Sequence, residues 1–219
     1  MYGQAFKRGS FMRPIVFGFF ILASLFFSLT EAWAVEYPWK LRLNQEEISV
    51  YTRKVEASSI LEYKAKMIVD AKLSKLIYLF EDVEKISQWY HQCVQSKLIQ
   101  SESVESQIIY FVLHLPWPVA ERDCVFRQIK SLDPVSGEVS YTLSAVSGNF
   151  PQQKGRIRAL DLNSIWRFKP LKDGRTEVYF QQHSDPGGSI PSFLVNKLSV
   201  EIPFYSFKNL RQMIYQIKD

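Results

Sequence analysis

Three histidines, His91, His114 and His183, are the side chains best suited to acid–base or metal chemistry. None of them stands in an HExxH pair or at the spacing of a zinc finger. The tripeptide His91-Gln92-Cys93 offers two metal-binding side chains, but it is more simply explained as the end of a helix that runs into a strand. The spacing therefore predicts no metal site and no cofactor.

Motifs for nucleophilic catalysis or nucleotide binding are missing from the sequence, which has no GxSxG elbow, no P-loop and no GxGxxG. The stretch Gly187-Gly188-Ser189 resembles a phosphate-binding turn because it opens a predicted helix. It lacks the lysine that would follow, so we interpret it as a helix start. We expect a protein that is not an enzyme. An enzyme whose site assembles in an apolar cavity is the alternative, and its candidate groups are His114, His183, Tyr141 and Arg158.

The composition indicates a folded domain, because 47% of the 219 residues are hydrophobic and 22% are charged. Only one apolar run is long enough to matter for a membrane, which excludes a polytopic membrane protein. The net charge is +5, and part of it lies in the N-terminal segment. Because the basic residues form no clustered stripe, we expect no nucleic-acid partner.

The N-terminal segment has the three parts of an export signal. Lys7, Arg8 and Arg13 precede an apolar run at 15–29, and Ala32-Trp33-Ala34 supplies small residues at a cleavage site. The run is shorter than the roughly 20 residues that span a bilayer. We therefore predict a signal peptide at 1–34, cleaved after Ala34, and a periplasmic or secreted domain at 35–219. The alternative is an uncleaved N-terminal membrane anchor.

Cys93 and Cys124 would lie in an oxidising compartment after export, where a disulfide can persist. The sequence leaves open whether the two are joined or are separate buried thiols.

The remaining chain alternates between strand and helix patterns, with no linker that divides it. A helical segment is predicted at 74–80, a short helical piece at 83–89 and a long helix from Ser189 to Gln216. Turn residues separate most of the predicted strands. These strands are 48–52, 61–69, 93–100, 106–114, 123–132, 138–146, 156–168 and 176–183.

The long C-terminal helix carries two apolar stripes on a helical wheel. One is formed by Leu194, Val195, Leu198, Ile202 and Tyr205, and the other by Leu210, Met213, Ile214 and Ile217. Pro203 lies between them and removes a backbone hydrogen bond. The helix is therefore expected either to bend around a curved sheet or to hinge so that one half can lift.

Three stretches of the remaining chain form a recognisable set: Leu115–Pro118 with Glu121–Asp123, Trp166–Pro170, and Asp185–Asn196. Together they resemble the START domain, the StAR-related lipid-transfer domain, and most closely its phosphatidylcholine-transfer members. The resemblance implies an α+β helix-grip (START / Bet v 1-like) fold, in which a curved antiparallel sheet wraps around the long C-terminal helix. It also implies an internal apolar tunnel that holds one lipid.

Strand alternation and this resemblance together predict the tunnel lining. Over 156–168, Arg158, Leu160, Leu162, Trp166 and Phe168 are expected to share the inner face. The loop Leu115–Ala120 and the helix around Leu194–Ile202 are predicted to form a lid. The predicted lipid-contacting residues are Trp117, Phe126, Gln128, Tyr141, Leu143, Arg158, Leu162, Trp166, Phe180, Gln182, Leu194, Leu198 and Ile202.

Two positions depart from the phosphatidylcholine-binding members. The inward arginine of those members corresponds to Gln128, with Arg127 turned to the other face, and a headgroup tyrosine corresponds to Leu162. Arg158 is the residue that could supply a charge from another strand, which would imply either an acidic headgroup or a position at a solvent-exposed mouth.

The sequence thus predicts a monomeric lipid-binding and lipid-transfer protein that meets a membrane surface transiently and carries a lipid or another hydrophobic small molecule. The alternatives are a sensor or binding module without transfer, and a cyclase or hydrolase of the wider helix-grip superfamily.

Overall fold

The computed structural model describes residues 37–148 and 150–217, which lie within the compact unit Val35–Asp219. The predicted export signal at 1–34, and with it the alternative of an N-terminal anchor, lies outside the described residues. No helix in the described part of the chain is both long and apolar enough to cross a bilayer.

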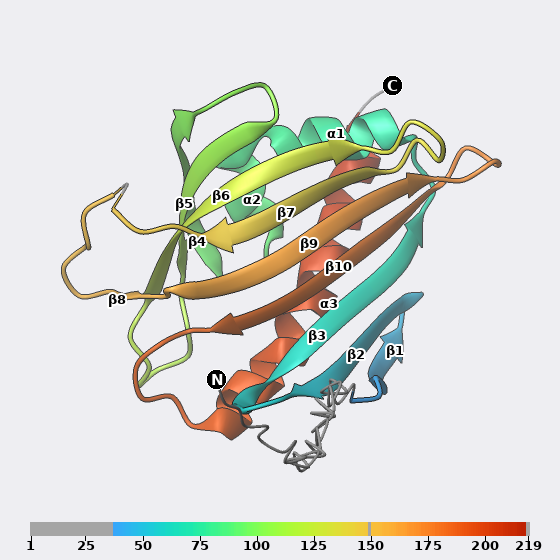
Figure 1. The fold of residues 1–219 in the computed structure, drawn as a ribbon. Coiled ribbons are helices and arrows are strands. Elements are labelled where there is room, and N and C mark those ends of the chain that lie inside the picture. Colours follow the sequence, from blue (N-terminus) through green and yellow to red (C-terminus); the bar gives the residue numbers. More distant parts are fainter. Residues whose placement is uncertain (1–36, 149, 218–219) are drawn as a thin grey trace, which may run out of the picture. The chain divides into compact units, whose positions relative to one another are not determined.

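One large sheet forms the body of this unit, in the order β1-β2-β3-β10-β9-β7-β6-β5-β4 (Figure 1). Neighbours along this path pair antiparallel, whereas the short β8 pairs parallel with β6. The strands are β1 Lys40–Gln45, β2 Ile48–Val55, β3 Ser58–Val69, β4 Cys93–Ser101, β5 Ser106–Leu113, β6 Arg122–Leu132, β7 Val139–Ala145, β8 Ile157–Arg158, β9 Asp161–Pro170 and β10 Thr176–Asp185.

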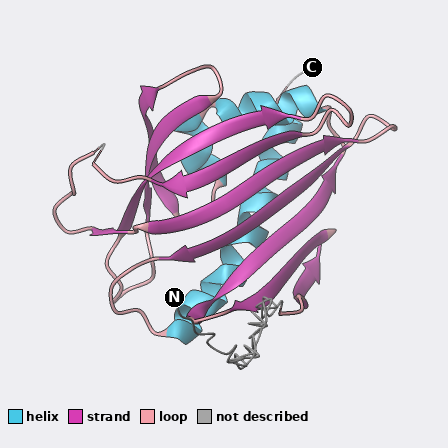
Figure 2. Cartoon of the chain, viewed as in Figure 1, coloured by secondary structure: helices cyan, strands magenta, loops and turns pink. Residues whose placement is uncertain are grey.

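The helices lie on one face of this sheet (Figure 2). Between β3 and β4 come α1 Leu73–Glu81, the 3₁₀ turn η1 Val83–Lys85 and α2 Ile86–Trp89. The long α3, Ser192–Gln216, packs against β2, β3 and α2. An antiparallel sheet with one apolar face must bury that face, and these helices pack over it. The predicted α+β helix-grip fold is therefore confirmed.

The predicted strand at 156–168 is two strands in the structure. The break at Ala159 and Leu160 separates β8 from β9, and Leu160 is 70% exposed. Alternation does not carry across an irregular break, because an extra residue moves later side chains to the other face. The prediction that Leu160 faces inward is wrong, whereas Leu162, Trp166 and Phe168 are buried.

The C-terminal helix differs from its prediction in two ways. It begins at Ser192 and not near Ser189, because Pro191 has φ of −55° and ψ of 128°, outside helical geometry. The helix continues through Pro203 and buries one continuous face that includes Leu198 and Ile214. Tyr205, predicted for the first stripe, is 42% exposed.

Aromatic rings fill the interior at the end of the sheet next to α1. Trp166 stacks on Phe180 with ring centroids 4.0 Å apart, and on Phe207 of α3 at 5.6 Å. Phe80 of α1 packs against the same group. We call this group the aromatic cluster, and its members are Phe80, Trp89, Tyr141, Trp166, Phe168, Phe180 and Phe207. It makes this end of the interior a packed core.

Candidate functional site

Beside the aromatic cluster the side chains leave space between them. The first cavity, which we call the deep cavity, holds about 430 Å³ of space between its lining side chains, part of it open to solvent. Its walls come from α1, α2 and the middle strands of the sheet. The residues that line it are Phe80, Ile86, Trp89, Tyr90, Phe111, Phe126, Gln128, Leu143, Leu162, Ser164, Trp166, Phe180 and Gln182.

Two further cavities adjoin the deep cavity. The mouth cavity, of about 550 Å³, lies where Leu115 meets Ile190 and Val195 at the start of α3. The side cavity, of about 350 Å³, reaches from Phe111 toward Pro186. Gln182 lines all three cavities. In place of one continuous tunnel, the structure has three adjoining cavities that share lining side chains.

The deep cavity is mostly apolar, but some of the residues that line it carry polar side-chain atoms without hydrogen-bond partners among the described residues. The Trp89 Nε1 and Ser164 Oγ atoms are buried and make no hydrogen bond with the described residues. The side-chain amides of Gln128 and Gln182, which also line it, make no hydrogen bond within the described part of the chain either. Because buried polar groups are normally paired, these atoms indicate a position for a ligand or an ordered water.

No Lys, Arg, Asp, Glu or His occurs among the described residues that line the deep cavity. Its one titratable phenol, Tyr90, is hydrogen-bonded to Tyr63. Burial raises the pKa of both hydroxyls above the ordinary value, so both are neutral at physiological pH. The deep cavity is therefore uncharged.

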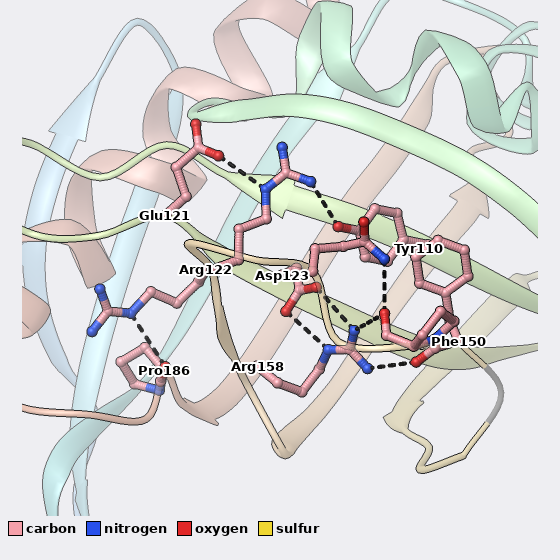
Figure 3. A network of polar contacts seen from close by, with 10 residues as sticks. Tyr110, Glu121, Arg122, Asp123, Phe150, Arg158 and Pro186 are labelled. Carbon is pink, nitrogen blue, oxygen red and sulfur yellow. Dashed lines mark hydrogen bonds and ion pairs between the residues drawn. The ribbon is translucent and has the colours of Figure 1, made fainter.

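Arg122 is a buried cation at the mouth, only 3% exposed, and it lines both the mouth cavity and the side cavity. Its guanidinium donates to the carbonyl oxygens of Ala120 at 2.6 Å and Gly187 at 3.0 Å. It also donates to the Pro186 carbonyl oxygen at 3.4 Å (Figure 3). Burial lowers its pKa, but an arginine stays charged. The side chain thus ties the loop before β6 to the turn before α3.

Arg158, predicted to line the tunnel, lies elsewhere. It forms a two-fold ion pair with Asp123, with Nε to Oδ1 and Nη2 to Oδ2 both 2.9 Å, and it also donates to the Phe150 carbonyl (Figure 3). Asp123 alternates with the inward-facing Cys124 and so projects from the other side of β6. The predicted tunnel role of Arg158 is therefore wrong, and hydrogen bonding to Asp123 raises the pKa of this guanidinium.

The structure brings together most of the other predicted lining residues. Those that line the deep cavity are Phe126, Gln128, Leu143, Leu162, Trp166, Phe180 and Gln182. Leu198 and Ile202 line the mouth cavity. Arg127 points away from the interior and pairs with Glu102 at 2.8 Å, so the deep cavity holds no arginine.

Three predicted residues lie outside these cavities. Tyr141 is buried in the aromatic cluster, and its hydroxyl donates to the Glu81 carboxylate at 2.7 Å. Leu194 is half-buried against the core. Trp117 is 92% exposed in the loop between β5 and β6.

Several lining residues were missed in the sequence. Ser164 lies on the same face of β9 as Leu162 and Trp166, so strand alternation could have identified it. Phe111 could have been found in the same way on β5. Arg122 stands at the end of a strand and contacts loops distant in sequence, and no local pattern signals such contacts.

The candidate groups for an enzyme do not share a cavity. His114 contacts Glu121 at the surface, and His183 contacts Ser58. Tyr141 and Arg158 are held by Glu81 and Asp123, as described above. Within residues 37–148 and 150–217, no His, Cys, Asp and Glu side chains gather in a group that could hold a metal ion.

Cys93 and Cys124 are both free and buried. They lie on β4 and β6, with β5 between them, so their backbones are about 10 Å apart at ordinary strand spacing. A disulfide needs Cα atoms within about 7 Å. The structure therefore resolves the open question in favour of two separate thiols.

Comparisons with known proteins give a consistent result. A family model described as START domain matches residues 28–216. An uncharacterised protein of Pseudomonas aeruginosa is 33% identical, over 81% of this chain and 87% of its own length. Mouse phosphatidylcholine transfer protein is 28% identical, over 72% of this chain and 75% of its own. A crystal structure of a STAR-related lipid transfer protein from Xanthomonas axonopodis matches with a TM-score of 0.75 at 32% identity, covering 81% and 99% of the two chains.

Proposed function

This chain belongs to the START domain family, and from that premise we propose that it binds one hydrophobic molecule between α3 and the sheet and transfers it between membranes. The named relatives are lipid-transfer proteins. We propose a carrying role without catalysis, because the candidate catalytic groups are held apart by other partners.

The observation that carries this proposal is the series of apolar cavities that ends at the mouth. Apolar side chains dominate all three cavities, and the mouth cavity lies between a loop and the first turns of α3. Burial of apolar area stabilises a bound molecule by about 25 cal/mol per Å². A long-chain ligand would therefore leave into water slowly and exchange faster at a membrane.

Exposed aromatic side chains stand near the mouth and support a membrane contact. Trp117 is 92% exposed and Phe193, in the first turn of α3, is 74% exposed. Tryptophan is favoured at membrane interfaces because it combines an apolar ring system with one polar N–H. We propose that this end of the molecule touches the bilayer transiently.

A direct test is to purify the full chain without detergent, extract it with organic solvent and identify any released hydrophobic molecule by mass spectrometry. The proposal expects one ligand per chain and movement of labelled lipid between donor and acceptor vesicles. A chain that is repeatedly free of ligand and moves no lipid would overturn it. A chain that holds a ligand but does not move lipid would support the binding-module alternative.

We further propose that residues 1–34 direct export and are removed, so that the domain works in the periplasm or outside the cell. Lys7, Arg8 and Arg13, the apolar run at 15–29 and the Ala32-Trp33-Ala34 site support this. N-terminal sequencing of the protein from the exported fraction should begin at Val35. Recovery of the uncleaved chain in the membrane fraction would favour an anchor.

A further inference from the structure

The unpartnered polar side chains that line the deep cavity restrict which chemical groups a bound ligand can place there. Trp89 is 1% exposed and Gln128 is 5% exposed, so both are withdrawn from bulk water. The indole Nε1–H of Trp89 can only donate a hydrogen bond. The Ser164 hydroxyl and the Gln128 and Gln182 amides can donate or accept. A group that satisfies all of them must offer at least one hydrogen-bond acceptor, and in most hydrophobic biological molecules that atom is an oxygen.

These atoms are spread over separate elements that meet at one place. Trp89 ends α2, and Gln128, Ser164 and Gln182 come from β6, β9 and β10. All four side chains line the same space, whose other walls are apolar. Such an arrangement, with a few polar groups among apolar and aromatic ones, is typical of a site that orients one end of a ligand.

The described lining of the deep cavity has no charged side chain, and this argues against a ligand whose buried end is a phosphate. A phosphate buried here would have no cation as partner, because the described residues that line the cavity include no Lys, Arg or His. Burial of an unpaired charge is strongly unfavourable. The buried cation of the interior, Arg122, lines the mouth and side cavities and is already bonded to three carbonyl oxygens.

We propose that the deep cavity binds the uncharged, oxygen-bearing end of a hydrophobic molecule, through a carbonyl or hydroxyl that accepts from Trp89 Nε1 and contacts Gln128, Ser164 and Gln182. The ligand class is therefore neutral: an acylglycerol, a hydroxylated polycyclic lipid or a prenylated quinone, and not a phospholipid headgroup. This inference rests on the proposed function, because it specifies the ligand of the same site.

The first experiment compares lipids that share their chains and differ in the head. The full chain is incubated with vesicles that contain equal amounts of dioleoylglycerol, dioleoylphosphatidylcholine, dioleoylphosphatidate and a prenylated quinone. The protein is then re-isolated, and its bound lipid is measured by mass spectrometry. We expect the neutral lipids to be enriched about tenfold or more over the phosphate-bearing ones.

Each outcome has a distinct meaning. Equal or preferential uptake of the phosphate-bearing lipids would overturn this inference and leave the proposed function intact. Uptake of none of the probes, together with no co-purified hydrophobic molecule, would overturn both.

The second experiment tests the polar contacts themselves. Trp89→Phe removes the indole donor and keeps an aromatic ring, and Ser164→Ala removes the unpartnered hydroxyl. Each is expected to weaken dioleoylglycerol binding about fivefold to tenfold, the effect of one lost hydrogen bond, with little effect on squalene, a hydrocarbon without oxygen. The matched control is Ser140→Ala on β7, at a position that alternates with the inward-facing Val139 and Tyr141.

Circular dichroism of each variant verifies that it is folded. If both deep-cavity variants bind dioleoylglycerol and squalene as the unmodified chain does, the polar atoms serve only an ordered water, and the inference is wrong.

Discussion

Neighbouring residues on one strand have opposite roles in this protein. Arg122 faces the interior at the mouth, while Asp123, the next residue of β6, projects to the other side and pairs with Arg158. The difference follows from strand geometry, because consecutive side chains point to opposite faces. The two members of one Arg-Asp motif thus have different roles, one at the mouth cavity and the other in a buried ion pair.

The Asp123–Arg158 pair should contribute strongly to stability. The Asp123 side chain is fully buried and that of Arg158 is 13% exposed, so removal of the carboxylate leaves a nearly buried cation without its partner. We expect Asp123→Ala to lower the free energy of unfolding by about 3 kcal/mol, measured by urea denaturation. Glu102→Ala breaks the exposed Arg127 pair and is the control, with a clearly smaller effect. Equal losses in the two variants would contradict this assignment.

The two cysteines should be unreactive in the folded protein. Burial raises the pKa of the Cys93 and Cys124 thiols to about 12, so almost no reactive thiolate is present at pH 8. We expect no labelling by iodoacetamide under native conditions and two labels per chain in denaturant without reductant. A chain that takes no label in denaturant, and is two mass units lighter than its reduced form, would reveal a disulfide in place of free thiols.

At the scale of elements, the turn between β10 and α3 fixes how the helix meets the mouth. The Asp185 carboxylate accepts a hydrogen bond from the Gly187 N–H at 2.8 Å, and Gly187 and Gly188 both have positive φ. A Cβ at Gly188 would lie 3.1 Å from Ile157 and 3.3 Å from the guanidinium of Arg122. The turn therefore needs glycine at this position both for its conformation and for its close contacts.

Substitution at this turn should destabilise the protein more than at another glycine of similar conformation. Gly188→Ala adds both backbone strain and contacts with Ile157 and Arg122, and we expect it to cost about 2 kcal/mol. Gly174→Ala is the matched control, because Gly174 has φ of +86° and nothing within 4 Å of its added Cβ. We expect about 1 kcal/mol there, again by urea denaturation. An equal cost at both positions would show that the contacts at Gly188 do not matter.

Most elements and much of the cavity lining could be predicted from the sequence, because regular alternation on β6, β7, β9 and β10 reports which side chains point inward. The prediction was wrong where the alternation breaks, at Ala159 and Leu160, and this error also misplaced Arg158. The edge strand β1 was not predicted, because it is short and largely exposed and so lacks a buried face. The partners of Arg122 are set by tertiary contacts that no local pattern encodes.

At the scale of the whole molecule, its two ends differ. The loop with Trp117 and the start of α3 lie at one end of the described unit, and α1 lies at the other (Figure 1). Only the first end adjoins the mouth cavity. The proposed membrane contact is therefore expected to depend on exposed aromatic residues near the mouth and not on those near α1.

The double variant Trp117→Ala/Phe193→Ala should slow lipid movement between vesicles at least about fivefold, because less apolar area enters the bilayer, with unchanged thermal stability. Tyr78→Ala is the control, since Tyr78 is 62% exposed on α1. Vesicle transfer of a fluorescent lipid measures both. Similar slowing in the control, or none in the double variant, would argue against a membrane contact at the mouth.

The aromatic cluster has a consequence for the direction in which a carried molecule travels. It packs the interior beside α1, so under the proposed function we expect a guest molecule to enter and leave at the mouth cavity and not beside α1. Under the proposed function, the part of a guest that is inserted first must be withdrawn last. A lipid taken from one bilayer would then be delivered to the next without reversing its orientation inside the protein.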